Sequence, residues 1–141
     1  MTITKKKLIE ELNKDLEWEF AAAIQYVQHA ASISGAQYDA IRKELIIHSQ
    51  EEMAHALTLS EQIDYLGGVP TMDVEKRVTS ETSLGMLKQD LEGEQLAIDR
   101  YKERIAQAEQ LKEYGLRRAL EDILIMEEEH KRDILSAVEN K

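Results

Sequence analysis

Apolar residues in this chain recur every three or four positions through four long stretches, with charged and polar residues between them. One face of an α-helix repeats with this period, so the pattern predicts helices at roughly residues 4–34, 37–66, 80–110 and 113–139. In the third stretch the apolar face is formed by Leu84, Leu87, Leu91, Ile98, Ile105 and Ala108. We therefore predict an all-α fold in which residues 1–141 form a single four-helix bundle domain.

The segments between the stretches predict how the helices are connected. Gly35 and Gly115 lie at two of the joints, where tight helix–helix turns favour glycine. The middle segment, residues 67–79, contains the only proline, and its thirteen residues cover about 43 Å when extended at ~3.3 Å each. A 28-residue helix is about 42 Å long. We therefore predict one long crossover along the bundle, which leaves the second and third helices parallel.

Composition narrows the class of protein. The chain is 43% hydrophobic and 33% charged, which is typical of a folded globular domain. Its formal net charge of −10 argues against a nucleic-acid partner, and the absence of cysteine excludes disulfides and thiolate metal sites. The first residues, MTITKKKLIEEL, lack the apolar core of a signal peptide, and no apolar run approaches the length of a membrane span. We expect a cytoplasmic protein that does not bind membranes.

Acidic and imidazole side chains occupy several positions on the apolar helix faces. A single Glu-x-x-His spacing is common on a solvated helix, but here it occurs twice, and each pair follows a lone core-facing glutamate by 33 residues. The positions are Glu19 in the first helix, Glu52 and His55 in the second, Glu94 in the third, and Glu127 and His130 in the fourth. These side chains are expected to point where the leucines point.

The two halves of the chain repeat this pattern with a constant offset of 75 residues. The offset relates Glu19, Tyr26, Glu52 and His55 to Glu94, Tyr101, Glu127 and His130, respectively. Surface charges have no reason to keep both the apolar phase and this register. The repeat therefore predicts one buried site near the middle of the bundle, with four carboxylates and two imidazoles.

Four carboxylates in an apolar interior repel one another strongly unless they are protonated or bind cations. Two divalent cations balance four negative charges, and neutral histidines add nitrogen ligands without adding charge. Oxygen and nitrogen ligands without sulfur fit iron or manganese, with zinc able to compete. This ligand set is that of the di-iron and di-manganese carboxylate bundles.

Four segments resemble those of the bacterioferritins, within the ferritin-like superfamily, and the likeness extends over nearly the whole chain. The segments are EFAAAIQYVQHA, EEMAHALTLSEQIDYLGGVP, DLEGEQLAIDRY and EEEHKRDIL. The resemblance implies two iron ions per subunit, bridged by Glu52 and Glu127 and completed by Glu19 with His55 and by Glu94 with His130. It also implies a di-iron ferroxidase that oxidises Fe(II) to Fe(III) with dioxygen or hydrogen peroxide and stores the iron in a homo-oligomeric cage.

Three further expectations concern the surroundings of this site. Tyr26 and Tyr101 either donate hydrogen bonds to the glutamates or are ordinary core tyrosines. Met53 resembles the methionine with which bacterioferritins ligate haem between two subunits. It also belongs to a second apolar stripe, with Ile46 and Leu57, that predicts a subunit interface. Plain interface packing by Met53 is the alternative to haem.

The remaining histidines and the end of the chain give less specific expectations. His48 is expected to be a hydrogen-bonded core residue or a third-metal or iron-transit residue, and His29 a structural residue. Trp18 is a candidate subunit contact. Only eleven residues follow His130, too few for the fifth helix of 24-subunit bacterioferritins, which favours a dodecamer. Alternative functions are a rubrerythrin-like peroxidase, a manganese catalase, or a non-catalytic helical interaction protein.

Overall fold

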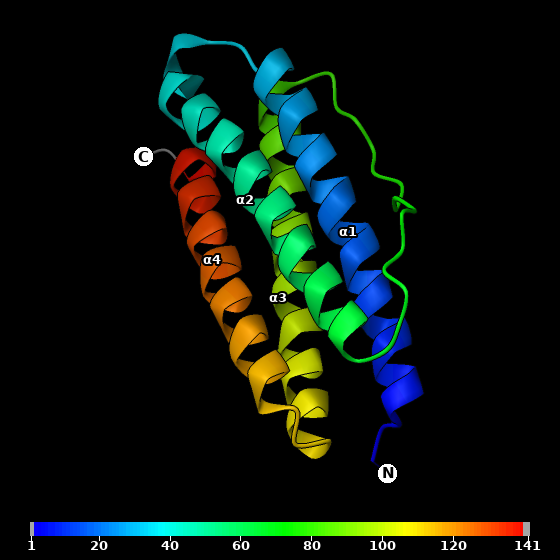
Figure 1. Ribbon diagram of the computed structural model, residues 1–141. Coiled ribbons are helices and arrows are strands. Elements are labelled where there is room, and N and C mark those ends of the chain that lie inside the picture. The colour runs from blue at the N-terminus through cyan, green and yellow to red at the C-terminus, as the bar shows by residue number, and fades with distance from the viewer. Residues whose placement is uncertain (1, 140–141) are drawn as a thin grey trace.

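The computed structural model describes residues 2–139, and these residues form four long helices and no strand (Figure 1). The helices are α1 (Lys5–Ser32), α2 (Asp39–Tyr65), α3 (Ser83–Gln110) and α4 (Tyr114–Val138), with a short 3-10 helix, η1 (Ala36–Tyr38), before α2. The predicted all-α fold is confirmed, and the observed helix ends differ from the predicted ones by at most three residues. Within this described part of the chain, no helix combines the length and apolar character that crossing a membrane requires.

The helices pack as two antiparallel hairpins, α1 with α2 and α3 with α4. α1 also contacts α3, and α4 also contacts α2, so that α2 and α3 occupy opposite corners of the bundle. The segment 66–82 runs back along α1 for the length of the bundle (Figure 1). This crossover makes α2 and α3 parallel, as predicted.

Side chains of α1 hold the crossover in place. Asn13 donates from Nδ2 to the Val69 carbonyl (3.1 Å) and accepts at Oδ1 from the Thr71 amide (2.8 Å). Further along, Gln25 Nε2 donates to the Val78 carbonyl at 2.9 Å. These bonds satisfy backbone groups of a segment that has no secondary structure of its own.

Trp18 anchors the same crossover and is half-buried within its own chain. The guanidinium carbons of Arg77 and Arg100 lie 5.7 and 5.2 Å from its ring centre, a cation–π arrangement. Arg77 passes so close to Gly93 that a Cβ there would lie 2.0 Å from Nη2. Glycine at position 93 thus leaves room for the arginine that packs on Trp18.

The helix ends follow ordinary capping chemistry, with one departure from the sequence prediction. Thr4 and Thr82 cap the starts of α1 and α3 by accepting backbone N–H bonds at their hydroxyls. Gly35 adopts a left-handed φ of 112° at the first hairpin turn, as a glycine joint would. At the second hairpin the left-handed residue is Lys112 (φ 58°), whereas Gly115 lies in the first turn of α4. The expectation that Gly115 forms this turn was wrong.

The apolar core is divided into two clusters along the bundle axis. One cluster consists of Leu8, Leu12, Leu16, Ala56, Leu59, Ile63, Leu66, Ala97, Tyr101, Ala108, Leu116, Leu120 and Ile123. The other consists of Tyr26, Ala30, Ile33, Ile41, Leu45, Met86, Leu87 and Ile134. Between them lies a level of the bundle where the buried side chains are polar.

Candidate metal centre

The polar level between the two apolar clusters contains the six side chains that the repeat singled out. They come from all four helices, and each is at most 6% exposed: Glu19, Glu52, His55, Glu94, Glu127 and His130. On α2 and α4 the glutamate and histidine are three residues apart, so both point to the same side of their helix. The structure thus brings together every residue that was expected at the centre.

The six residues form two overlapping groups of potential ligand atoms. Glu19 and His55 belong to one group, and Glu94 and His130 belong to the other. The carboxylates of Glu52 and Glu127 belong to both, and within each group the atoms lie within 4.8 Å of one another. This geometry matches two cation positions that share two bridging carboxylates.

The histidines face this shared pair through their Nδ1 atoms. His55 Nδ1 lies 3.2 Å from both Glu52 Oε1 and Glu127 Oε1. His130 Nδ1 lies 3.3 Å from Glu52 Oε1 and 3.5 Å from Glu94 Oε1. Each imidazole therefore approaches carboxylates of both halves of the chain.

The buried atoms of the centre are short of hydrogen-bond partners. Seven have none within residues 2–139: Glu19 Oε2, Glu52 Oε1, His55 Nδ1, Glu94 Oε2, both oxygens of Glu127, and His130 Nδ1. A buried polar atom without a partner costs roughly 1–3 kcal/mol. Seven such atoms facing one another are the donors that bound cations would need, so the donor set fits two metal ions.

At this level of the bundle the pKa values of two glutamates and of both histidines are raised. Burial raises the pKa of Glu52 and of Glu127 well above the ordinary value, and the neighbouring carboxylates add to the increase. Burial acts to lower the pKa of the two histidines, but the adjacent carboxylates outweigh it and raise the pKa of His55 to about 10 and of His130 to about 9. Without cations the centre therefore holds protons, which bound cations would displace.

Two tyrosines donate hydrogen bonds to the lone glutamates, each to the glutamate of the other half of the chain. The Tyr26 hydroxyl on α1 donates to Glu94 Oε1 on α3 at 2.5 Å. The Tyr101 hydroxyl on α3 donates in turn to Glu19 Oε1 on α1. Each tyrosine thus fixes the carboxylate supplied by the other half, an arrangement that the sequence did not reveal.

A buried polar pair lies beyond each tyrosine, and sequence reasoning missed both pairs. Arg104 donates from Nε to Asp15 Oδ2 (2.7 Å) and from Nη2 to Asp15 Oδ1 (3.1 Å). His29 Nδ1 lies 2.7 Å from Asp90 Oδ1, and all four residues are at most 2% exposed. The 75-residue offset relates Asp15 to Asp90 and His29 to Arg104, so the signal that found the six central residues could have found these pairs too.

The two histidines of the centre differ in what lies behind them. His130 Nε2 lies 3.2 Å from Glu51 Oε1, which can hold the ring and fix its tautomer. The counterpart of Glu51 in the repeat is Met126, which offers no such carboxylate to His55. The two halves of the centre are therefore similar in their ligand atoms and unequal in the support of their imidazoles.

Met53 lies apart from this centre, on the outer face of α2, where 48% of it is exposed. It lines a shallow groove between α1 and α2 together with Phe20 and Leu57. Ile46 and Leu57 are exposed on the same helix, which agrees with the predicted second apolar stripe. The structure thus places Met53 on an open apolar surface and not in the core.

Comparison with known proteins identifies the family. The model of the ferritin-like domain matches residues 9–140. The chain belongs to the ferritin-like family. A bacterioferritin from Desulfovibrio desulfuricans is 28% identical over 127 residues, which cover 89% of this chain and 71% of that relative.

Two solved structures of this family share the fold closely. A ferritin-like, di-iron carboxylate protein from Bacillus anthracis strain Ames superposes with a TM-score of 0.92 at 33% identity, over 98% of this chain and 99% of the other. A dodecameric thioferritin from Bacteroides fragilis, described as bacterioferritin-related, gives 0.91 at 30% identity, over 99% and 88%. The resemblance to bacterioferritins within the ferritin-like superfamily is thereby confirmed.

Proposed function

We propose that this ferritin-like chain is a ferroxidase that oxidises Fe(II) at the buried centre and stores the ferric product. The observation that supports it most directly is the set of seven unpartnered buried ligand atoms, arranged as two groups around Glu52 and Glu127. By this proposal Glu19 and His55 complete one iron position, and Glu94 and His130 complete the other. Hard carboxylate ligands favour Fe(III) over Fe(II), which suits an oxidising site.

The reaction needs two Fe(II) ions at once because the oxidant accepts electrons in pairs. Two Fe(II) ions lose one electron each, and dioxygen takes up these electrons and two protons to become hydrogen peroxide. Hydrogen peroxide as the oxidant would instead give two waters from the same electrons and protons. The chain's residues hold the two substrate ions side by side, and Tyr26 and Tyr101 keep the lone carboxylates oriented.

Aerobic addition of Fe(II) tests this proposal. We expect rapid ferric absorbance in the wild type and its loss in Glu127→Ala, since that change removes a carboxylate common to both positions. Glu129→Ala is the matched control, because Glu129 lies two residues away on α4 and is exposed. Equal oxidation by Glu127→Ala and the wild type would overturn the assignment. A manganese catalase would instead decompose hydrogen peroxide when loaded with Mn(II).

We propose further that the chains assemble into a dodecameric cage. The exposed apolar residues of α1 and α2 supply a surface for chain-to-chain contact, and the similar Bacteroides fragilis protein is dodecameric. With a chain mass of 16.2 kDa, light scattering should give about 194 kDa for twelve chains. A mass near twice that value would instead indicate 24 chains.

Met53 supports a proposed haem shared by two chains. Its thioether lies in an apolar groove that also contains Phe20 and Leu57, which suits the porphyrin of a group ligated from both sides. After expression with adequate haem, we expect a Soret band in the wild type and none in Met53→Leu. A cage without this band in the wild type would leave Met53 as a packing residue.

A further inference from the structure

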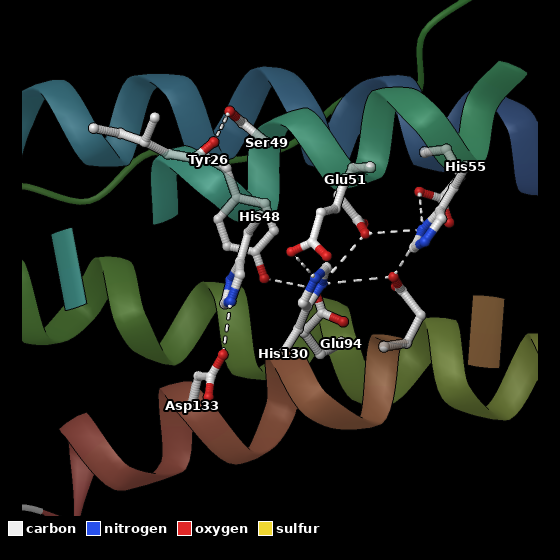
Figure 2. A network of polar contacts seen from close by, with 12 residues as sticks. Tyr26, His48, Ser49, Glu51, His55, Glu94, His130 and Asp133 are labelled. Carbon is white, nitrogen blue, oxygen red and sulfur yellow. Dashed lines mark hydrogen bonds and ion pairs between the residues drawn. The ribbon is translucent and has the colours of Figure 1, made fainter. Parts of the chain in front are cut away.

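A third cluster of potential metal ligands lies beside the centre, on the side of His130. It consists of Glu44 and His48 from α2 and Asp133 from α4, with ligand atoms within 4.8 Å of one another. The His48 ring stacks on the His130 ring, with centroids 4.0 Å apart and planes inclined by 25°. Figure 2 shows His48 reaching from α2 toward Asp133, next to His130.

The cluster spans from the buried interior to the surface. His48 is 1% exposed, its Nε2 lies 3.1 Å from Asp133 Oδ2, and its Nδ1 has no hydrogen-bond partner in the described chain. The Asp133 side chain is 44% exposed, and Glu44 is half-buried. Both carboxylates line an open groove between α2 and α4 that also contains Gln37. A cation in solution can therefore reach these oxygens without opening the bundle.

The repeat shows that the fold does not need these ligands. The counterparts of Glu44, His48 and Asp133 are Ala119, Ile123 and Thr58, in that order. None of these three provides a charge or an imidazole, although they too lie on α2 and α4. The polar cluster therefore occurs at one of the two equivalent places between α2 and α4, and it needs another explanation than packing.

We propose that Glu44, His48 and Asp133 bind a third divalent cation, outside the two positions of the centre. Two carboxylate oxygens and one imidazole nitrogen suit a first-row transition metal ion, with water completing its coordination. The position lies between the groove and His130, so a cation bound there is placed to pass to the His130 half of the centre. This delivery role rests on the proposed ferroxidase function, whereas the binding site does not.

Equilibrium dialysis with Zn²⁺ tests the site without any redox reaction. The variant Glu44→Gln/Asp133→Asn should bind one Zn²⁺ fewer per chain than the wild type. Glu61→Gln/Asp122→Asn makes the same changes on the same helices, away from the cluster and at exposed residues, and should bind as the wild type does. Equal Zn²⁺ stoichiometry in all three proteins would overturn the site. Glu44 and Asp133 are both partly exposed, and circular dichroism would verify that the variant folds.

Stopped-flow oxidation under limiting Fe(II) tests delivery. Charged surfaces that focus ions raise association rates by about tenfold or more, so we expect the initial rate of Glu44→Gln/Asp133→Asn to fall by about that factor while the control keeps the wild-type rate. A lost Zn²⁺ with an unchanged rate would overturn the delivery role. A wild type that binds three Zn²⁺ but does not oxidise Fe(II) would refute the ferroxidase proposal and leave the third site standing.

Discussion

The two hairpins of the bundle are alike inside and different outside. At the offset of 75, the residues of the centre and the tyrosines beside it are the same in both halves, and leucines such as Leu12 and Leu45 recur as Leu87 and Leu120. The outer apolar residues Phe20, Ile24, Val27, Ile46, Met53 and Leu57 are replaced in the second half by Gln95, Asp99, Lys102, Glu121, Glu128 and Arg132. The six central residues and the two tyrosines are thus the same in both halves, whereas these outer positions are apolar in one half and polar or charged in the other.

This difference separates two kinds of constraint. In the proposed metal centre two cations take matching ligands from both halves, which accounts for the identity of the six central residues across the repeat. A group of exposed apolar residues on one face is typical of an interaction surface, and Ile24, Val27 and Leu57 are 55%, 59% and 63% exposed in the single chain. The exposed apolar residues of the α1–α2 hairpin are therefore the candidate surface for the proposed assembly, whereas α3 and α4 expose fewer large apolar residues, among them Leu96 and Ile125.

Giving the first half the outer residues of the second should have the largest effect. Met53→Glu combined with Leu57→Arg introduces the residues that Glu128 and Arg132 provide in the other half. Burying these charges against a partner is unfavourable, so we expect the assembly to dissociate into single chains or small oligomers by light scattering. Both positions are exposed in the chain, so its helix content should not change.

A change at the corresponding positions of the other hairpin is the control for this experiment. Glu128→Ala with Arg132→Ala alters the corresponding positions of α4 and should leave the assembly at its wild-type mass. Dissociation by this variant, or an intact assembly with Met53→Glu and Leu57→Arg, would contradict the division between a covered and a solvated face.

Breaking the two buried polar pairs should cost different amounts of stability although the repeat relates them. Asp15→Ala leaves the Arg104 guanidinium buried without its partner, which should lower the free energy of unfolding by about 3–5 kcal/mol. His29→Gln should cost less, about 1–3 kcal/mol, because Asp90 can take up a proton. Burial, opposed by His29, raises the pKa of Asp90 to about 6. Urea denaturation of the metal-free protein measures both, and equal losses would contradict this reasoning.

The centre should make the metal-free protein less stable as the pH rises. The pKa values of His55 and His130 are raised from about 6.5 to about 10 and about 9, so the folded state binds more protons than the unfolded state in this range. Stability should therefore fall between pH 6.5 and 10, and the raised pKa values of Glu52 and Glu127 act in the same direction. Melting temperatures across this range provide the measurement, and a rising melting temperature would contradict the assigned protonation.

The tyrosines should give the smallest effects, equal in the two halves. Tyr26→Phe and Tyr101→Phe each remove one hydrogen bond to a lone glutamate, at a cost of about 0.5–1.5 kcal/mol. We expect each variant to slow Fe(II) oxidation by a similar factor. A much larger loss in one variant would show that the two metal positions have different roles.

The sequence was sufficient to predict the bundle and its centre because two independent patterns coincide. Helical periodicity assigns a face to each residue, and the 75-residue offset selects those polar residues that keep the same face in both halves. Glu19, with Trp18 beside it, illustrates this: only Glu19 has both the apolar phase and a matching counterpart at 94. The crossover was predictable because its length matches that of a helix.

Contacts that depend on how helices meet were not predictable from the chain. The bonds from Tyr26 to Glu94 and from Tyr101 to Glu19 require the α1–α3 pairing, which no sequence period specifies. The cluster of His48 with Asp133 has no counterpart in the repeat and becomes visible only when α2 and α4 are placed together. The sequence also did not predict that Lys112, and not Gly115, adopts the left-handed conformation at the second turn. The reason is that α3 ends at Gln110, before the glycine.

Anomalous scattering from crystals soaked in Zn²⁺ tests directly whether residues of both halves together bind two cations. At the centre itself, apart from the site proposed at His48, we expect two peaks, one at His55 and one at His130. Their Zn–N distances should be about 2.0–2.1 Å, with the carboxylates of Glu52 and Glu127 between them. An empty centre at saturating Zn²⁺, or one peak bound by the residues of a single half, would show that the repeated residues do not form a two-cation site.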